Sequence, residues 1–248
     1  MLISRGVFTD VEVEESNRNK VIVYINSRLA EEACTSRVAA ERMLKTRKKK
    51  CKVVIRHAVN LPIGAGFGTS GAGALGVSLA LNRALNLNLT CNEIGENAHV
   101  AEVICSTGLG TVGPQLAGRG LLLTLRGGAP GCNLIDCIPI SQKLRVIAGC
   151  FGTISKKDAL ASHRVKCSVN RLGRRAMALI MREPTPENFM KVCKNFAFDG
   201  PFLTTRVRNL IEDLLEYEVI GTTQNMIGEA VHALVDERNI RRILPVFR

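Results

Sequence analysis

A glycine-rich segment at residues 61–76, LPIGAGFGTSGAGALG, constrains the fold of this chain more than any other stretch of its sequence. Gly64, Gly66 and Gly68 allow tight turns and let a ligand approach the backbone without obstruction from a Cβ atom. The long apolar segment that follows contains too many glycines for helix propensity alone, so it predicts a buried helix. A glycine-rich turn that opens a helix predicts a phosphate site, because backbone N–H groups and the positive end of the helix dipole converge there.

The order of residues in this segment argues against two common phosphate loops. No Gly-Lys-Ser/Thr sequence closes it, as it would in a Walker loop. The companion acid that a dinucleotide-binding fold places on a following strand is also missing. Judged from its glycines alone, the segment is equally well interpreted as a packing turn.

The flanking sequence predicts strands and helices in alternation. Residues 6–14 and 20–26 surround the polar turn SNRNK, a pattern typical of a hairpin. A helix is expected from about Thr35, and a second helix opens at Thr90 with Glu93 three residues later, the pattern of a capping box. Further strands are predicted at residues 53–57, 121–126, 132–140 and 143–150.

From about Asp158 the apolar periodicity becomes helical. We predict helices at residues 169–181, 185–196, 203–218 and 223–237. No long linker or internal repeat interrupts the chain, so this helix-rich second part is expected to pack closely on the first.

The charge of the chain favours anionic partners or substrates. Lysine and arginine number 34 against 22 acidic residues, a net charge of +12. The densest cluster, KTRKKKCK at residues 45–52, is best interpreted as a solvated helix end whose cations complement the helix dipole. Binding to nucleic acid is the weaker interpretation, because no recognised binding motif accompanies this cluster.

Cysteine usage and hydropathy predict a cytoplasmic protein. The 9 cysteines are scattered without a CxxC pair, which argues against a zinc site, and several lie in apolar runs such as AEVIC and VIAGC. They are expected to be reduced and to act as small apolar residues. No signal peptide or stretch of the ~20 apolar residues needed to cross a bilayer is present, so no membrane partner is expected.

The glycine-rich segment resembles the phosphate motif of the GHMP kinases, Pro-x-x-x-Gly-Leu-Gly-Ser-Ser-Ala/Gly-Ala. The matching positions are Pro62, Gly66, Phe67, Gly68, Thr69, Ser70, Gly71 and Ala72, with Phe67 and Thr69 as mild departures. The extended form GFGTSGAGALG is especially similar to that of archaeal pantoate kinases. The resemblance implies that the amides from Gly64 to Gly71 hold the phosphates of ATP, and that Ser70 places its hydroxyl on a metal ion.

Three later matches follow in the same order as in pantoate kinases. In AHVAEV, the resemblance implies that Glu102 binds the nucleotide's Mg²⁺ and that His99, on the same helical face, holds pantoate. A lone histidine on such a helix is otherwise more often a packing residue. The second match is the segment STGLGTVGPQLAG, which is followed by GGAPG as in that family. The third is the segment TTQNMIGEAVHAL, which is similar to the family's Met-x-Gly helix start, where Gly228 would approach the nucleotide.

The chain also departs from the family pattern. Thr111 stands where many GHMP kinases carry an aspartate that serves as base or electrostatic aid. An arginine expected to meet the pantoate carboxylate is replaced near Thr124, and Arg126 is the substitute candidate. The family's opening Pro-Gly motif does not precede SRGV, which begins here at Ser4, and Arg5 would be what remains of that edge of the substrate pocket.

The resemblance implies an α+β fold with the two-part GHMP kinase architecture. Residues 1–140 would form a ribosomal-protein-like αβ domain that binds ATP, and residues 141–248 a helix-rich C-terminal domain. The family also suggests a homodimer, although the sequence locates no interface.

The implied reaction is Mg²⁺- and ATP-dependent phosphorylation of pantoate to 4-phosphopantoate, an early step of coenzyme A biosynthesis. Two alternatives stay open. One is a GHMP kinase for another small hydroxylated metabolite, and the other is a catalytically weakened paralogue that binds nucleotide. A nucleic-acid-binding protein comes last, and steep salt dependence of such binding would be needed to revive it.

Overall fold

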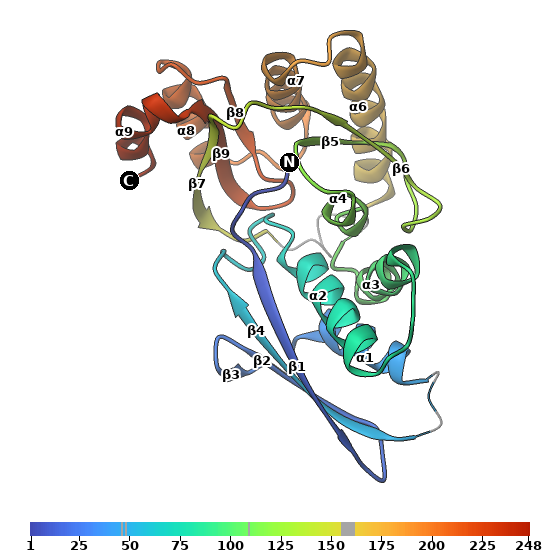
Figure 1. The fold of residues 1–248 in the computed structure, drawn as a ribbon. Coiled ribbons are helices and arrows are strands. Elements are labelled where there is room, and N and C mark those ends of the chain that lie inside the picture. The colour runs from blue at the N-terminus through green and yellow to red at the C-terminus, as the bar shows by residue number, and fades with distance from the viewer. Residues whose placement is uncertain (46, 48, 109, 155–161) are drawn as a thin grey trace. The chain divides into compact units, whose positions relative to one another are not determined.

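The computed structural model of the chain describes residues 1–45, 47, 49–108, 110–154 and 162–248 (Figure 1). The described residues form two compact units. The first combines Met1–Ile63 with Gly68–Asp136, and the second combines Gly64–Phe67 with Cys137–Arg248. The division therefore falls inside the glycine-rich segment, whose first glycines are counted with the second unit.

A four-stranded sheet in the order β1-β4-β2-β3 forms one layer of the first unit. Its strands are β1 (Val7–Glu15), β2 (Lys20–Ile25), β3 (Arg28–Leu29) and β4 (Cys51–Val59). β1 pairs antiparallel with β4, and β2 pairs parallel with it, so the predicted hairpin between β1 and β2 is wrong. β4 lies between β1 and β2, and its fully buried residues, such as Val53 and Ile55, belong to the core that the sheet shares with the helices.

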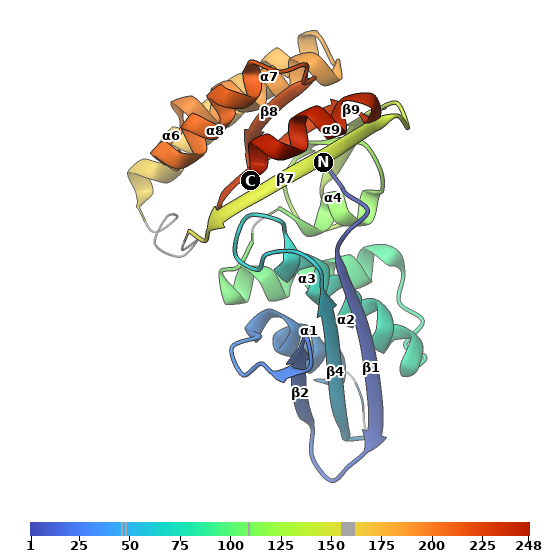
Figure 2. The ribbon, with the colours of Figure 1, turned by 90° about the vertical axis from the view of Figure 1, so that its left-hand side faces the viewer.

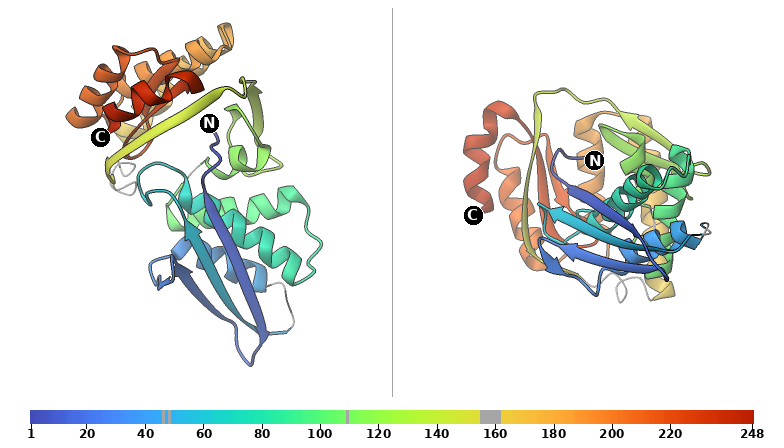
Figure 3. Two further views of the ribbon diagram at one scale, coloured as in Figure 1. Left: turned by 60° about the vertical axis from the view of Figure 1, so that its left-hand side comes forward. Right: turned by 60° about the horizontal axis from the view of Figure 1, so that its bottom comes forward.

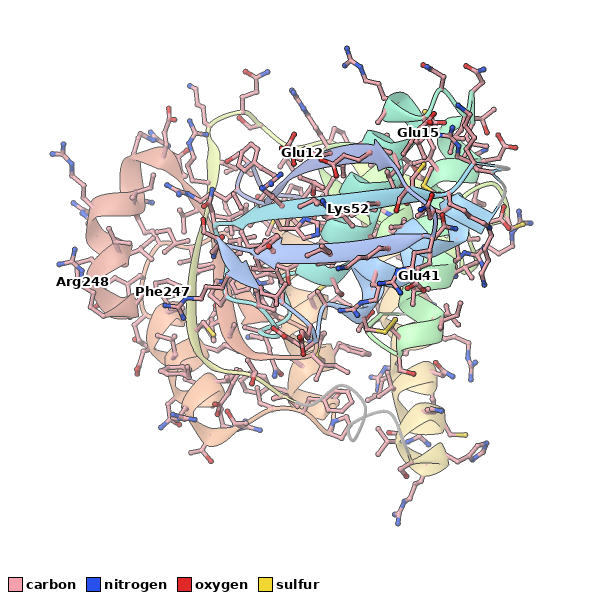
Figure 4. All side chains as sticks on the ribbon, turned by 90° about the horizontal axis from the view of Figure 1, so that it is seen from below. Glu12, Glu15, Glu41, Lys52, Phe247 and Arg248 are labelled. Atoms are coloured by element: carbon pink, nitrogen blue, oxygen red, sulfur yellow. A yellow bond between two sulfur atoms is a disulfide. The ribbon has the colours of Figure 1, made fainter. Side chains whose placement is uncertain are left out.

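Helices form the second layer of this unit. They are α1 (Cys34–Lys45), α2 (Thr69–Ala84), α3 (Cys91–Cys105) and the short α4 (Val112–Ala117). Figure 2 shows α1, α2 and α3 on one side of the sheet, where they share a core with its strands. The opposite side carries exposed ion pairs, Lys52 with Glu14 at 2.8 Å and Arg56 with Glu12 at 3.0 Å. Figure 4 labels Lys52 and Glu12 on these strands. One face of the sheet is therefore apolar and the other is charged.

The predicted capping box is confirmed at the start of α3. The Thr90 hydroxyl accepts a hydrogen bond from the Glu93 amide, and the Glu93 carboxylate accepts one from the Thr90 amide. At the other end of α3, Cys105 forms a disulfide with Cys34 at the start of α1, with 6.2 Å between their Cα atoms. The expectation that all cysteines are reduced is therefore wrong for this pair, which the chain's fold brings together across 71 residues.

The second unit contains a three-stranded antiparallel sheet in the order β7-β9-β8. Its strands are β7 (Leu144–Gly152), β8 (Gly221–Gln224) and β9 (Glu229–Asp236). The helix predicted at residues 223–237 is wrong, because this segment forms the second half of β8, a turn and β9. Val231, Leu234 and Val235 are buried along β9, so the apolar run that looked helical is a strand covered on both faces.

Three long helices belong to this unit: α6 (His163–Arg182), α7 (Pro186–Asp199) and α8 (Thr205–Leu215). They confirm the other predicted helices, whereas Asp158 lies outside the described residues. In Figure 3, α7 and α8 pack against β8, and α6 packs against α7. The chain ends in η1 (Glu237–Asn239), α9 (Ile240–Ile243) and η2 (Leu244–Phe247).

Two smaller strands, β5 (Leu121–Arg126) and β6 (Leu134–Ile138), pair as a separate ribbon, which accounts for the remaining predicted strands (Figure 1). Among the described helices, none is long and apolar enough to cross a membrane.

Candidate phosphate and metal site

The glycine-rich segment adopts a conformation that suits an anion. Gly64, Gly66 and Gly68 have φ angles of 80°, 83° and 70°, in the left-handed region that favours glycine. Gly68 is the N-cap of α2, and among the described residues no side chain caps this helix and no acidic residue lies in its first turn. The first amides of α2 are therefore left for a ligand, and the helix dipole favours a negative one.

Within the second unit, the segment that contains Asn225 and Gly228 packs on the first half of this loop. A Cβ atom added at Gly228 would overlap the carbonyl group of Ala65 and lie 2.7 Å from the amide nitrogen of Gly66. One added at Gly66 would lie 2.8 Å from the backbone oxygen of Asn225. The backbones of Gly228 and Asn225 thus pack directly on the loop, and only glycine fits at the contact points.

A partly buried histidine fixes the side chain of Asn225. Nδ1 of His232, on β9, makes a short hydrogen bond with Asn225 Oδ1. Burial lowers the pKa of His232 to about 4, so the ring is neutral at neutral pH and donates Nδ1–H to the amide oxygen. Both residues lie in the segment TTQNMIGEAVHAL that resembles the family motif, but the sequence analysis singled out only Gly228 in it.

Ser70 and Glu102 meet behind the first turn of α2. The Ser70 hydroxyl donates to Glu102 Oε1 at 2.7 Å, and Glu102 is fully buried on α3. A Cβ atom added at Gly108 would lie 2.5 Å from Oε1, and one added at Gly71 would lie 3.0 Å from Oε2. Two glycines thus leave the space in which this carboxylate sits beside the phosphate loop.

These donors fit a magnesium ion. A hydroxyl and a carboxylate are hard oxygen ligands, and Mg²⁺ in kinases takes one or two such groups and completes its shell with water and substrate phosphates. Within the described ranges, no cluster of three His, Cys, Asp or Glu residues could hold a metal by itself. A cation at Ser70 and Glu102 would therefore depend on the nucleotide for its remaining ligands.

Within the first unit, the short helix α4 contacts the loop at Gly68. The Gln115 side chain donates from Nε2 to the backbone oxygen of Gly68 at 3.0 Å. A Cβ atom at Gly68 would lie 2.7 Å from Cγ2 of Thr111, the N-cap of α4. The sequence analysis singled out Thr111 but missed Gln115. The position of Gln115, four residues after Thr111 in GTVGPQ, was a usable signal.

The predicted substrate residues lie in different settings. His99 is half-buried one helical turn before Glu102, and its Nδ1 is buried without a hydrogen-bond partner among the described residues. Arg126 is exposed and donates to the backbone oxygen of Cys132 at 3.0 Å, so it is engaged with the GGAPG turn. Arg5 is exposed beside Gly6, whose carbonyl accepts from the Asn60 amide just before Pro62.

Comparison with known proteins agrees with this geometry. The GHMP kinases N terminal domain family model matches residues 33–118. The pantoate kinase of Methanocaldococcus jannaschii is 28% identical over 249 residues, which cover 99% of this chain and 86% of that protein. The pantoate kinase of Thermococcus kodakarensis is 31% identical over 183 residues, 74% of this chain and 59% of that protein.

A solved structure described as a phosphotransferase related to the CoA biosynthesis pathway superposes with a TM-score of 0.87 at 27% identity, covering 98% of this chain and 80% of its own. The chain belongs to the GHMP kinase superfamily, with the two-part α+β fold of that superfamily. Within it, the curated relatives to which the chain is similar are pantoate kinases, and the resemblance predicted from the motifs is confirmed.

Proposed function

We propose that this chain transfers the γ-phosphoryl group of ATP to a hydroxyl of pantoate, giving 4-phosphopantoate and ADP in coenzyme A biosynthesis. The similarity to pantoate kinases over 99% of the chain supports the choice of acceptor. The observation that carries the chemistry is the Ser70–Glu102 hydrogen bond of 2.7 Å at the start of the phosphate-loop helix.

In this proposal the loop and the helix α2 hold the nucleotide. Amides from Gly64 to Gly71 would bind the phosphate oxygens, and the positive end of α2 would favour their charge. Ser70 and Glu102 would hold Mg²⁺, which, when bound, neutralises charge on the transferring phosphoryl group. Gly228 supports this arrangement by its packing on Ala65 and Gly66.

The acceptor would be oriented by side chains outside the loop. The buried Nδ1 of His99 supports a role in holding pantoate, because a polar atom buried without a partner is costly unless a ligand satisfies it. Arg5 is a second candidate for the pantoate carboxylate, since its neighbour Gly6 is bonded to the residue that leads into the loop. Arg126 has weaker support, because its guanidinium already binds a backbone carbonyl.

A threonine at position 111 cannot act as a carboxylate base. Phosphoryl transfer depends chiefly on positioning and on charge neutralisation, which the loop amides, Ser70 and Glu102 would supply. We therefore propose turnover without a side-chain base at this position.

The test is release of ADP by the purified protein with Mg-ATP and a panel of hydroxylated acceptors headed by pantoate. Ser70→Ala and Glu102→Gln are each expected to reduce pantoate-dependent turnover by about a hundredfold or more, by analogy with the loss of one transition-state donor. Glu96→Gln, on the exposed side of the same helix α3, is the matched control and should leave turnover intact. Unchanged turnover in both site variants would contradict the assignment of these residues.

A second candidate is a GHMP kinase for another small hydroxylated acceptor. The hydrogen bond from Arg126 to the backbone oxygen of Cys132 favours it, because this guanidinium is engaged with the backbone and not with a carboxylate of the acceptor. Turnover with a different member of the panel, and none with pantoate, would establish this alternative. ATP binding without turnover on any acceptor would indicate a catalytically weakened relative.

A further inference from the structure

Gln115 lies beside the proposed metal site, and its side-chain amide is held in one orientation. Its Nε2 donates to the backbone oxygen of Gly68 at 3.0 Å. A backbone oxygen can only accept, so the amide nitrogen must face Gly68 and the amide oxygen must point away from it. The hydrogen bond therefore decides where Oε1 is.

The amide oxygen is buried and has no hydrogen-bond partner among the described residues. A Cβ atom added at Gly71 would lie 3.1 Å from Gln115 Oε1 and 3.0 Å from Glu102 Oε2. Both oxygens therefore face the same residue of α2, next to Ser70. A buried acceptor without a hydrogen-bond donor is unfavourable, so its placement beside a carboxylate calls for a cation or a donor between them.

We propose that Gln115 Oε1 is a further oxygen ligand of the divalent cation held by Ser70 and Glu102, bound directly or through one water molecule. This inference rests on the proposed function. A neutral amide oxygen, a hydroxyl and a carboxylate form a set of hard donors that suits Mg²⁺ or Mn²⁺. Gln115 would thus join the phosphate loop to the cation, with Nε2 on the loop and Oε1 on the metal side.

The alternative is that Gln115 only anchors the loop through Nε2. Gln115→Met and Gln115→Glu separate the two roles, because both remove the Nε2 donor while keeping the length of the side chain. An anchor alone predicts that both substitutions weaken binding in the same direction. A cation ligand predicts opposite directions, since Glu adds a carboxylate next to Glu102 and Met removes the oxygen.

The measurement is titration of each protein with Mn²⁺ in the presence of ADP, following free Mn²⁺ by electron paramagnetic resonance. We expect Gln115→Met to weaken Mn²⁺ binding about tenfold, a loss typical of groups that support a metal, and Gln115→Glu to tighten it. Without metal, Gln115→Glu should also show a lower Tm than wild type, with a larger rise when Mn²⁺ is added, because the cation relieves repulsion between two carboxylates.

Two controls make the result specific. Gln142→Glu adds the same charge at an exposed position before β7 and should leave Mn²⁺ binding unchanged. Glu102→Gln should abolish Mn²⁺ binding, and its failure to do so would overturn the proposed metal site as a whole. If Glu102→Gln abolishes binding while both Gln115 variants weaken it equally, or neither changes it, only the inference on Gln115 is overturned.

Discussion

Gly228 shows how a single residue far along the chain controls the phosphate loop. It lies in the turn between β8 and β9, and its missing side chain lets the backbone rest on Ala65 and Gly66. Ala65 is fully buried in this contact. Because the obstructing atoms are backbone atoms, the structure cannot accommodate a Cβ atom by turning a flexible side chain away.

Gly228→Ala is therefore expected to displace the loop. We predict a loss of about 1–3 kcal/mol in the free energy of unfolding, the usual cost of overpacking, together with at least about a tenfold weaker affinity for ADP. Urea unfolding and calorimetric titration with ADP measure the two effects. Gly173→Ala is the matched control, since among the described residues a Cβ atom there would approach Phe196 alone, at 3.9 Å, and the change should stabilise α6. Wild-type behaviour of Gly228→Ala in both measurements would show that the loop does not depend on this contact.

At this scale the sequence predicted the residues that belong to a contiguous motif. Gly64, Gly66 and Gly68, predicted to allow tight turns, have positive φ angles, and Ser70 does meet Glu102. Gln115 and Asn225 were missed because their importance comes from contacts with the loop backbone. Such contacts depend on tertiary structure, and the only local signal was the spacing of four residues between Thr111 and Gln115.

Among the elements, helix α3 carries the predicted capping box at its start and the proposed metal ligand near its end. The capping box holds Thr90 and Glu93 at its start, and hydrogen bonds from Thr90 lower the pKa of the Glu93 carboxyl group. Glu102 lies near the other end of the helix, where Ser70 and the close approach of Gly71 and Gly108 hold it. The cap should thus stabilise the helix without setting the position of the carboxylate.

Thr90→Ala tests this separation. Loss of the N-cap hydroxyl should lower the free energy of unfolding by about 1 kcal/mol, measured with urea, and leave Mn²⁺ binding in the presence of ADP unchanged. Ser168→Ala, inside helix α6, removes a hydroxyl of the same kind without removing a cap and should not destabilise the chain. Weaker Mn²⁺ binding by Thr90→Ala, without a loss of stability, would mean instead that the cap positions Glu102.

The two elements that sequence reasoning predicted wrongly fail for a common reason. The hairpin of β1 and β2 was inferred from a short polar turn, yet both strands pair with β4, which follows some 25 residues after β2 ends. The helix predicted at residues 223–237 was inferred from an apolar run that is a buried strand between two partners. In both cases long-range pairing overrode the local pattern, whereas the helices with strong periodicity, such as α8, were predicted correctly.

For the whole molecule, each unit has a histidine that couples folding to pH. In the first unit, His57 is bonded through its ring nitrogens to Thr9 and Ser36, both at 2.9 Å, and burial lowers its pKa. In the second unit, burial lowers the pKa of His232 to about 4. Both side chains are therefore favoured in their neutral form by folding, and the unfolded chain binds protons more readily than the folded chain.

The sign of the pH dependence follows from this difference. The stability that His232 contributes is fully present above the unfolded pKa of about 6.5, and it is lost progressively as the pH falls through about 4. Within that window we predict a decrease of up to about 1.4 kcal/mol in the free energy of unfolding per pH unit from this residue, with His57 adding in the same direction. Urea unfolding at a series of pH values between 7.5 and 4.5 measures the slope.

His232→Gln, which keeps an amide donor for Asn225, should reduce the slope, whereas His163→Gln on the exposed start of α6 should not. A slope that is the same in wild type and His232→Gln would show that this histidine already binds its proton in the folded chain.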